Sequence, residues 1–307
     1  MEDLGGRRTT ELLKKLESAV PWEALAKLVR PLYRNDAVQG GRPPIAAVQM
    51  LKCLMLCKWF GLSDPQLEEQ VNDRISFSRF VGLRAREAAP DETTMVNFRG
   101  RLREAGMFEE LFNRLRRHLD EQGLIVREGT VVDATIIEQS RGRRREDGTS
   151  TRDPEASYTK KGGQIHHGYK LHTAVDLASG LIRTLSFTTA KVHDSRAIDH
   201  LMADEAHAVI ADSAYDDADR RRRLQARGVL DGIMYKRRRG QAKLHPWQQR
   251  INRAVAKLRG RGELPFAWLK RFQGLARVRY HGLQRNADDA YCHALAFNCR
   301  RMLSVTK

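Results

Sequence analysis

The apolar pattern of the sequence changes near Val126, and this change constrains the fold more than any other feature. Before it, apolar residues recur three and four positions apart, as in IAAVQMLKCLMLCKWFGL (45–62), which is typical of amphipathic helices. After it come short β-branched runs bounded by turn residues, which are typical of strands. The 307 residues leave room for about two domains. We therefore expect an all-helical module over residues 1–125 and an α/β domain over residues 126–307.

The second half predicts a mixed sheet. VVDATII (131–137) is expected to form a strand, and an exposed, mobile basic loop is expected over about 141–163. Two further strands then meet at a turn through residues 178–180, and a helix, the strand HAVIADSAY (207–215), a basic helix and another strand follow. The chain is helical again from Trp247 onward. Strands that first follow one another and then alternate with helices describe an α/β domain with a mixed sheet.

Two aspartates stand inside or at the end of apolar strands. Asp133 lies within VVDATII, and Asp212 closes the apolar run of HAVIADSAY. Strands disfavour Asp, and a carboxylate among apolar neighbours is costly unless a cation offsets its charge. Either residue alone could be a strand-end cap or a turn former. Two of them in one domain favour a shared site for Mg²⁺ or Mn²⁺, which prefer hard oxygen ligands.

A third acid, Glu263, is expected from the helical tail. Arg259 precedes it by four residues and Lys270 follows it by seven. At 100° per residue both cations point within about 40° of the carboxylate on an ideal helix. This helix face would combine a metal ligand with two phosphate-binding cations, although an ordinary solvated ion pair has the same spacing. Gly260, Gly262 and Pro265 are expected to weaken the helix.

The charge distribution points to a polyanionic partner for the second half. Residues 1–129 hold 21 Lys and Arg against 19 Asp and Glu, whereas residues 130–307 hold 34 against 19. An excess of this size suits nucleic acid. Lys52 and Lys58 interrupt the most apolar stretch, which is too short to span a bilayer, so no membrane partner is expected. Four Cys in a chain of this length and the lack of a signal-peptide pattern favour a cytoplasmic protein. A nucleic-acid partner would make it nucleoid-associated.

Several separated motifs resemble one family in the same order. They include GRPPI and PDETTMVNFRGRL in the helical half, then REGTVVDATII, VIADSAY and ELPFAWLKRFQGLARVRYHGLQRN. Together they resemble the DDE transposases of bacterial insertion sequences, in the group named after insertion sequence five. Mapped onto the acidic triad of that family, the catalytic and metal-binding residues are Asp133, Asp212 and Glu263. Members often carry a Tyr at the position that Ala256 occupies here.

The resemblance implies a fold, a reaction and partners. The fold would be a ribonuclease-H-like catalytic domain preceded by a helical module for DNA binding or dimerisation. Two Mg²⁺ or Mn²⁺ ions would support cleavage at the terminal inverted repeats and joining of the 3′-hydroxyl ends to target DNA. The partners would be double-stranded DNA and a second copy of the chain, as a homodimer or larger synaptic complex. A catalytically silent, domesticated DNA-binding protein and a related metal-dependent nuclease stay open as alternatives.

The DNA contacts are predicted from the basic runs RGRRR (141–145), RRRR (220–223) and KRRR (236–239), and from residues near the triad. Trp247 is the candidate for contact with an unpaired base. The predicted DNA-binding residues are Arg259, Lys270, Lys170, Tyr169, Arg141, Arg143, Arg144, Arg145, Arg237, Arg238, Arg239, Arg277, Arg279 and Trp247. The spacing of His166, His167 and His172 also allows a zinc site, although no Cys lies near them.

Overall fold

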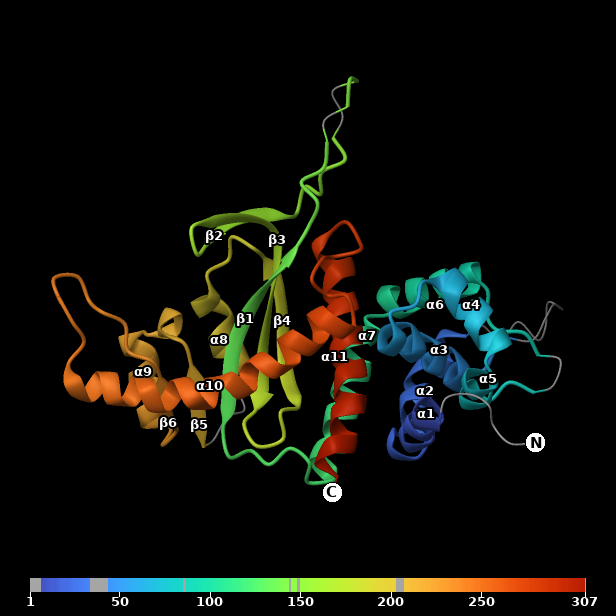
Figure 1. The fold of residues 1–307 in the computed structure, drawn as a ribbon, viewed down its shortest axis with the longest axis horizontal. Coiled ribbons are helices and arrows are strands. Elements are labelled where there is room, and N and C mark those ends of the chain that lie inside the picture. Colours follow the sequence, from blue (N-terminus) through green and yellow to red (C-terminus); the bar gives the residue numbers. More distant parts are fainter. Residues whose placement is uncertain are drawn as a thin grey trace. The chain divides into compact units, whose positions relative to one another are not determined.

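The chain divides into two compact units in the computed structural model (Figure 1). The structure describes residues 7–33, 44–84, 87–143, 145–147, 150–202 and 207–306. One unit comprises Met1–Glu121 and Tyr291–Lys307, and the other comprises Gln122–Ala290. Within the described ranges, no helix combines the length and the apolar character that crossing a bilayer requires.

The first unit is helical, as the periodicity predicts. Its helices are α1 (Arg7–Ala19), α2 (Trp22–Val29), the short 3₁₀ helix η1 (Arg30–Leu32), α3 (Ala47–Phe60), α4 (Asp64–Asp73), α5 (Ile75–Val81), α6 (Glu92–Glu104) and α7 (Met107–Glu121). Side-chain caps start two of them: the Ser63 hydroxyl accepts from the Gln66 N–H, and the Asp91 carboxylate accepts from the Thr94 N–H. α3 is buried on nearly all sides, and the ammonium group of Lys52 pairs there with Glu17 at 2.7 Å.

The last helix, α11 (Leu283–Val305), is shared between the two units. Residues 291–307 belong to the helical unit, whereas the sequence pattern assigned them to the α/β domain. The indole N–H of Trp59 donates to the carbonyl of Ala296 at 2.8 Å, and Lys58 lies 3.2 Å from His293. A buried Trp needs a partner for its N–H, and the returning chain supplies that partner.

The second unit contains the mixed sheet. Its strands are β1 (Thr130–Glu138), β2 (Ser157–Lys161), β3 (Gln164–Asp176), β4 (Ile182–Thr189), β5 (Ala208–Ala211) and β6 (Leu230–Ile233). The order is β2-β3-β1-β5-β6, with β4 paired to β3. β1, β3 and β4 pair antiparallel, whereas β1, β5 and β6 pair parallel. The helices of this unit are α8 (Asp194–Leu201), η3 (Ser213–Tyr215), α9 (Ala218–Ala226) and α10 (Pro246–Phe272).

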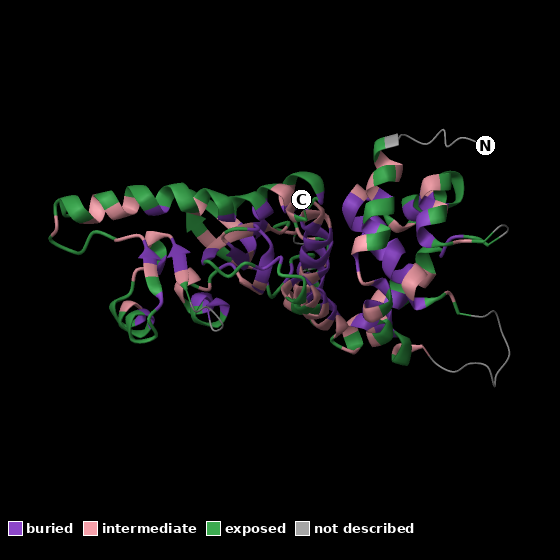
Figure 2. Cartoon of the chain, turned by 90° about the horizontal axis from the view of Figure 1, so that it is seen from below, coloured by how far each residue is buried: buried purple, intermediate pink, exposed green. Residues whose placement is uncertain are grey.

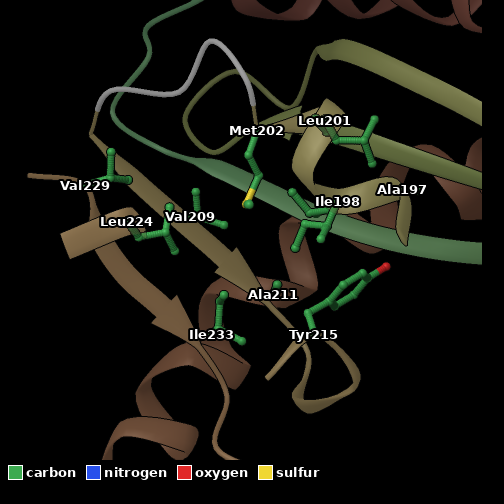
Figure 3. Close-up of a cluster of buried hydrophobic side chains, with 12 residues drawn as sticks. Ala197, Ile198, Leu201, Met202, Val209, Ala211, Tyr215, Leu224, Val229 and Ile233 are labelled. Atoms are coloured by element: carbon green, nitrogen blue, oxygen red, sulfur yellow. The ribbon is translucent and has the colours of Figure 1, made fainter. Parts of the chain in front are cut away.

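Successive side chains of β1 and β5 point to opposite faces of the sheet, as strand geometry requires. Val132 and Ala211 belong to a buried cluster with α8, η3 and α9 (Figure 3). Val131 and Ile210 instead pack against Val255 of α10. In Figure 2 the strands are mainly coloured as buried, whereas α10 is mostly exposed or intermediate. The long helix α10 therefore covers one face of the sheet with a narrow apolar stripe.

The predicted basic loop is partly ordered into a hairpin. β2 occupies Ser157–Lys161 within the stretch 141–163 and pairs antiparallel with the start of β3. The alternation in SYTKK is short, and a Gly-Gly turn follows it, so the pattern alone predicts a loop. The hairpin brings basic residues close to β1, where the candidate site lies.

Candidate active site

Strand parity places Asp133 and Asp212 on the sheet face that α10 covers. Asp133 follows Val131 by two residues and therefore faces the same side, and Asp212 has the same relation to Ile210. The parallel register of β1 and β5 pairs Val132 with Ala211, so the two aspartates follow directly on neighbouring strands. Adjacent strands lie about 4.8 Å apart. The structure thus brings these two predicted residues together.

Helix α10 brings Glu263 close to the two aspartates. This helix runs without interruption from Pro246 to Phe272, so the predicted weakening by Gly260, Gly262 and Pro265 does not break it. Gly262 lies against β1: a Cβ added to it would meet the Cγ1 atom of Val131 at 2.5 Å. From the sequence, Gly262 is predicted only to weaken the helix; its position next to Glu263 is the signal that points to its packing function.

One guanidinium group links all three acids. Nη2 of Arg259 lies 3.4 Å from Oδ2 of Asp133, and Nη1 lies 3.5 Å from Oδ2 of Asp212. Nη2 is also 4.0 Å from Oε1 of Glu263. The side chains of Arg259 and Asp133 are each 19% exposed, so this cation offsets carboxylates that are partly removed from water. Arg259 was predicted to bind DNA, and its contacts in this structure are with the triad.

The electrostatics of the site depend on burial. Burial raises the pKa of the Asp133 carboxyl, and the Ala134 N–H, Arg259 and Lys161 each oppose that shift. Burial also raises the pKa of the Tyr215 hydroxyl, and the nearby carboxylates of Asp194, Asp133 and Asp212 add to the effect. A desolvated carboxylate is stabilised by any cation brought against it. Asp133 is therefore the member of the triad with most to gain from a cationic partner.

The donor set fits a hard divalent cation. Carboxylate oxygens are the ligands that Mg²⁺ and Mn²⁺ prefer. Thr173 lies directly across from Asp133 in the β1–β3 register, and its buried hydroxyl has no hydrogen-bond partner among the described residues. A hydroxyl in that position could bind a water molecule carried by an ion. In the part of the chain described, no three carboxylates, imidazoles or thiolates are grouped closely enough to share an ion.

The three histidines of the possible zinc site have separate partners. His166 Nδ1 lies 3.0 Å from Glu138 Oε1, and His167 Nδ1 lies 3.2 Å from the carbonyl of Gln139. His172 Nε2 lies 2.9 Å from the hydroxyl of Thr188. Each contact engages one ring nitrogen, whereas the buried Nε2 of His167 and Nδ1 of His172 have no hydrogen-bond partner among the described residues.

Tyr169 and Lys170, both predicted to lie near DNA, have partners within the protein. Tyr169 is fully buried, and its hydroxyl donates to Asp153 at 2.6 Å. Lys170 pairs with Asp194 at 2.8 Å and donates to the carbonyl of Val192. The Tyr169 phenol has no exposed surface in this structure, and Lys170 has a carboxylate partner, so a DNA contact of Lys170 stays a prediction.

Two residues of the run RRRR (220–223) are structural, whereas Arg222 and Arg223 are exposed. Arg220 is buried and donates to Asp199, to the Ser195 carbonyl and to the Tyr215 carbonyl. Arg221 pairs with Asp216 and Asp231. A buried guanidinium needs several acceptors, so these side chains hold α9 to its surroundings and are not presented to a phosphate backbone.

The other predicted DNA contacts are exposed and stay predictions. They are Arg141, Arg143, Arg145, Arg237, Arg238, Arg239, Arg277 and Arg279. Arg144 lies outside the described residues. Trp247 lies in the first turn of α10, 46% exposed, with its ring 5.0 Å from that of Tyr235. These two rings line a pocket of about 680 Å³ together with Lys236, Arg238 and Arg239.

Lys270 occupies a second pocket, next to the triad. Its ammonium group donates to the carbonyl of Ile136 at 2.9 Å and so ties α10 to β1. The pocket has a volume of about 300 Å³, and it also contains Lys161, His166 and Arg277. Lys161 and His166 were not predicted as DNA-binding residues, because their role depends on the hairpin that the sequence pattern did not predict.

The chain matches two protein-family models. One, described as "Transposase DDE domain", matches residues 125–299, and the other, described as "Transposase domain (DUF772)", matches residues 3–101. Among solved structures, the chain is similar to the cryo-EM structure of a piggyBac transposase synaptic complex with hairpin DNA. The TM-score is 0.49 at 9% identity, over 97% of this chain and 74% of that chain. The first family match and the mixed sheet confirm the predicted ribonuclease-H-like α/β fold with a helical N-terminal region.

Proposed function

The chain belongs to the family of transposases that carry a DDE domain, and from this premise we propose that it moves an insertion sequence related to insertion sequence five. It would bind the terminal inverted repeats of that element, cleave the DNA at the element ends and join the freed 3′-hydroxyls to target DNA. Two copies at least would be needed, because two ends must be held together.

The observation that carries the proposal is the convergence of Asp133, Asp212 and Glu263 on one guanidinium. They come from β1, from the end of β5 and from α10, which are far apart in the sequence. An isolated acid at a strand end is explained by capping, as with the Ser213 N–H that Asp212 accepts. Three acids around one cation, on a domain with a strong positive excess, are better explained by phosphodiester chemistry.

Each residue would have a distinct task. Asp133, Asp212 and Glu263 would hold the divalent ions, which when bound activate the attacking hydroxyl and stabilise the leaving oxygen. Lys270 holds α10 against β1 through the Ile136 carbonyl and so orients Glu263. Arg259 would neutralise the non-bridging oxygens of the substrate once the ions take over the carboxylates. The exposed arginines would supply salt-dependent affinity without sequence information.

The proposal is tested with the DNA that flanks the coding region. Purified protein, Mg²⁺ and a plasmid carrying the gene with its native flanks should yield an excised segment whose 3′ ends become joined to a second plasmid. Cleavage without joining would instead support the metal-dependent nuclease. Specific binding without cleavage in Mg²⁺ or Mn²⁺ would support the silent DNA-binding protein.

Replacing Arg259 by Ala is expected to strengthen the binding of Mn²⁺ to the DNA-free protein. The guanidinium group and a divalent ion compete for the same three carboxylates, and one unit charge at about 4 Å contributes on the order of 4 kcal/mol at an effective dielectric constant near 20. Isothermal titration calorimetry should show Kd for Mn²⁺ falling by about tenfold or more. Arg253→Ala, an exposed position on the same helix, is the matched control. Equal Mn²⁺ affinity in Arg259→Ala and wild type would contradict the competition.

A further inference from the structure

The pocket that contains Lys270 lies beside the triad, at the end of β1. Thr135, which lines it, follows Asp133 by two residues on the same strand face. Two residues of a strand span roughly 6.6 Å, which is comparable to the step between neighbouring phosphates of one DNA strand. The pocket volume of about 300 Å³ is at the small end of the range for ligand sites. A phosphate bound in this pocket would thus lie about one phosphate-to-phosphate spacing from a phosphate bound at the triad.

Three separate segments deliver cations to this pocket. Lys161 comes from the end of β2, Lys270 from α10 and Arg277 from the segment after α10. That last segment is fixed by backbone bonds to β1: Glu138 N–H donates to Ala276 at 3.0 Å, and Val278 N–H donates to Glu138 at 2.9 Å. The pocket is therefore formed by anchored elements, with Lys270 anchored through the Ile136 carbonyl.

The cations of the pocket are not balanced by acids within the protein. Among the described residues, neither Lys161 nor Arg277 has a carboxylate oxygen within 4.0 Å. Glu138 is the one acid in the pocket lining, and it pairs with His166 at 3.0 Å. Burial lowers the pKa of Lys270, and the charge of Lys161 lowers it further. Like charges held this close are unfavourable until an anion enters between them.

We propose that this pocket binds a DNA phosphate adjacent to the one that is cut, with Lys161 and Arg277 as its main ligands and Lys270 as the third. The proposal rests on the proposed function, because it takes DNA as the substrate. Lys161 lines the pocket together with Thr135, two residues after Asp133, so the proposed subsite continues directly from the triad along β1. The subsite would set the register of the strand in the active site, which the triad alone cannot do.

The first test compares two adjacent lysines by their reactivity. Lys160 and Lys161 are both exposed on β2, but only Lys161 lines the pocket. Acetylation of the full chain in EDTA, read by mass spectrometry, should be slowed at Lys161 by duplex DNA and unchanged at Lys160. A second arm with inorganic phosphate shows whether the pocket accepts a free anion or needs the DNA backbone. Equal protection of both lysines by DNA would overturn the proposal.

The second test measures affinity for a labelled duplex in EDTA as salt is varied. One lost phosphate contact reduces the slope of log K against log salt by about 0.9, which is about eightfold in affinity at 0.1 M salt. Lys161→Ala and Arg277→Ala should each show this loss, Lys161→Arg should retain affinity, and Lys160→Ala should resemble wild type. Wild-type cleavage with equal slopes for Lys161→Ala and Lys160→Ala overturns the subsite alone. Binding with the expected losses but no cleavage overturns the proposed function alone.

Discussion

Asp133→Asn, Asp212→Asn and Glu263→Gln are each expected to reduce DNA cleavage by at least about 10³-fold while leaving DNA affinity within about twofold of wild type. An amide keeps the size of the carboxyl group but loses the charge that holds a divalent ion. Removing a negative charge beside the phosphate backbone does not weaken binding. Cleavage is measured on plasmid DNA carrying the element ends, and affinity is measured separately by anisotropy in EDTA.

The matched control for the triad is Asp219→Asn. Asp219 lies on α9, pairs with Arg222 on the surface and faces neither pocket. The same chemical change there should leave cleavage unaltered. If one triad variant cleaves at the wild-type rate, that residue does not hold the metal. A parallel loss of affinity in all three would instead show that the site had lost its folded geometry.

Much of the site could be predicted because strand parity and apolar pattern are local. Asp133 and Asp212 interrupt runs whose neighbours must be buried, so their direction follows from Val131 and Ile210. Glu263 needed the family resemblance as well, because Gly and Pro on both sides of it argue against a straight helix. The structure shows a continuous α10. Packing on β1 therefore outweighs the local propensity.

Other roles could not be predicted, because they depend on partners distant in the sequence. Nothing around Tyr169 indicates that Asp153 will accept its hydroxyl, and nothing in RRRR (220–223) separates Arg220 from its exposed neighbour Arg222. A run of basic residues shows where positive charge lies in the sequence, but it does not show which hydrogen-bond acceptors each side chain contacts. The same limit explains Lys161, which enters the site only through the β2–β3 pairing.

Helix α11 is divided between the two units for a related reason. Helix α11 begins in the α/β unit and ends in the helical one. A continuous helix carries no composition change at the point where its partners change. The indole N–H of Trp59, more than 230 positions earlier, donates to the carbonyl of Ala296. The periodicity of the sequence does not predict a hydrogen bond of this kind.

Gly262→Ala is expected to lower both stability and cleavage. The new methyl group would meet the Cγ1 atom of Val131 at 2.5 Å, and Val131 is a fully buried, β-branched residue that cannot turn aside. Overpacking of this kind costs about 1–3 kcal/mol, against a gain of about 1 kcal/mol from helix propensity. To relieve the contact, α10 must move away from β1 and carry Glu263 and Arg259 with it. A shift of about 1 Å in a catalytic group costs about 10²-fold in rate.

Gly260→Ala, two residues earlier on the same helix, separates this packing effect from the helix effect. A Cβ at Gly260 meets nothing within 4 Å, so that variant should gain about 0.5–1 kcal/mol in the free energy of unfolding and cleave normally. The two variants differ only in whether the added methyl group contacts β1. Adding Val131→Ala to Gly262→Ala removes the clashing methyl groups and should restore part of the cleavage activity, although Val131→Ala alone destabilises the core. Urea unfolding and cleavage assays on all four variants measure the coupling between positions 262 and 131. Additive effects of Gly262→Ala and Val131→Ala would show that α10 and β1 are not in tight contact at Gly262.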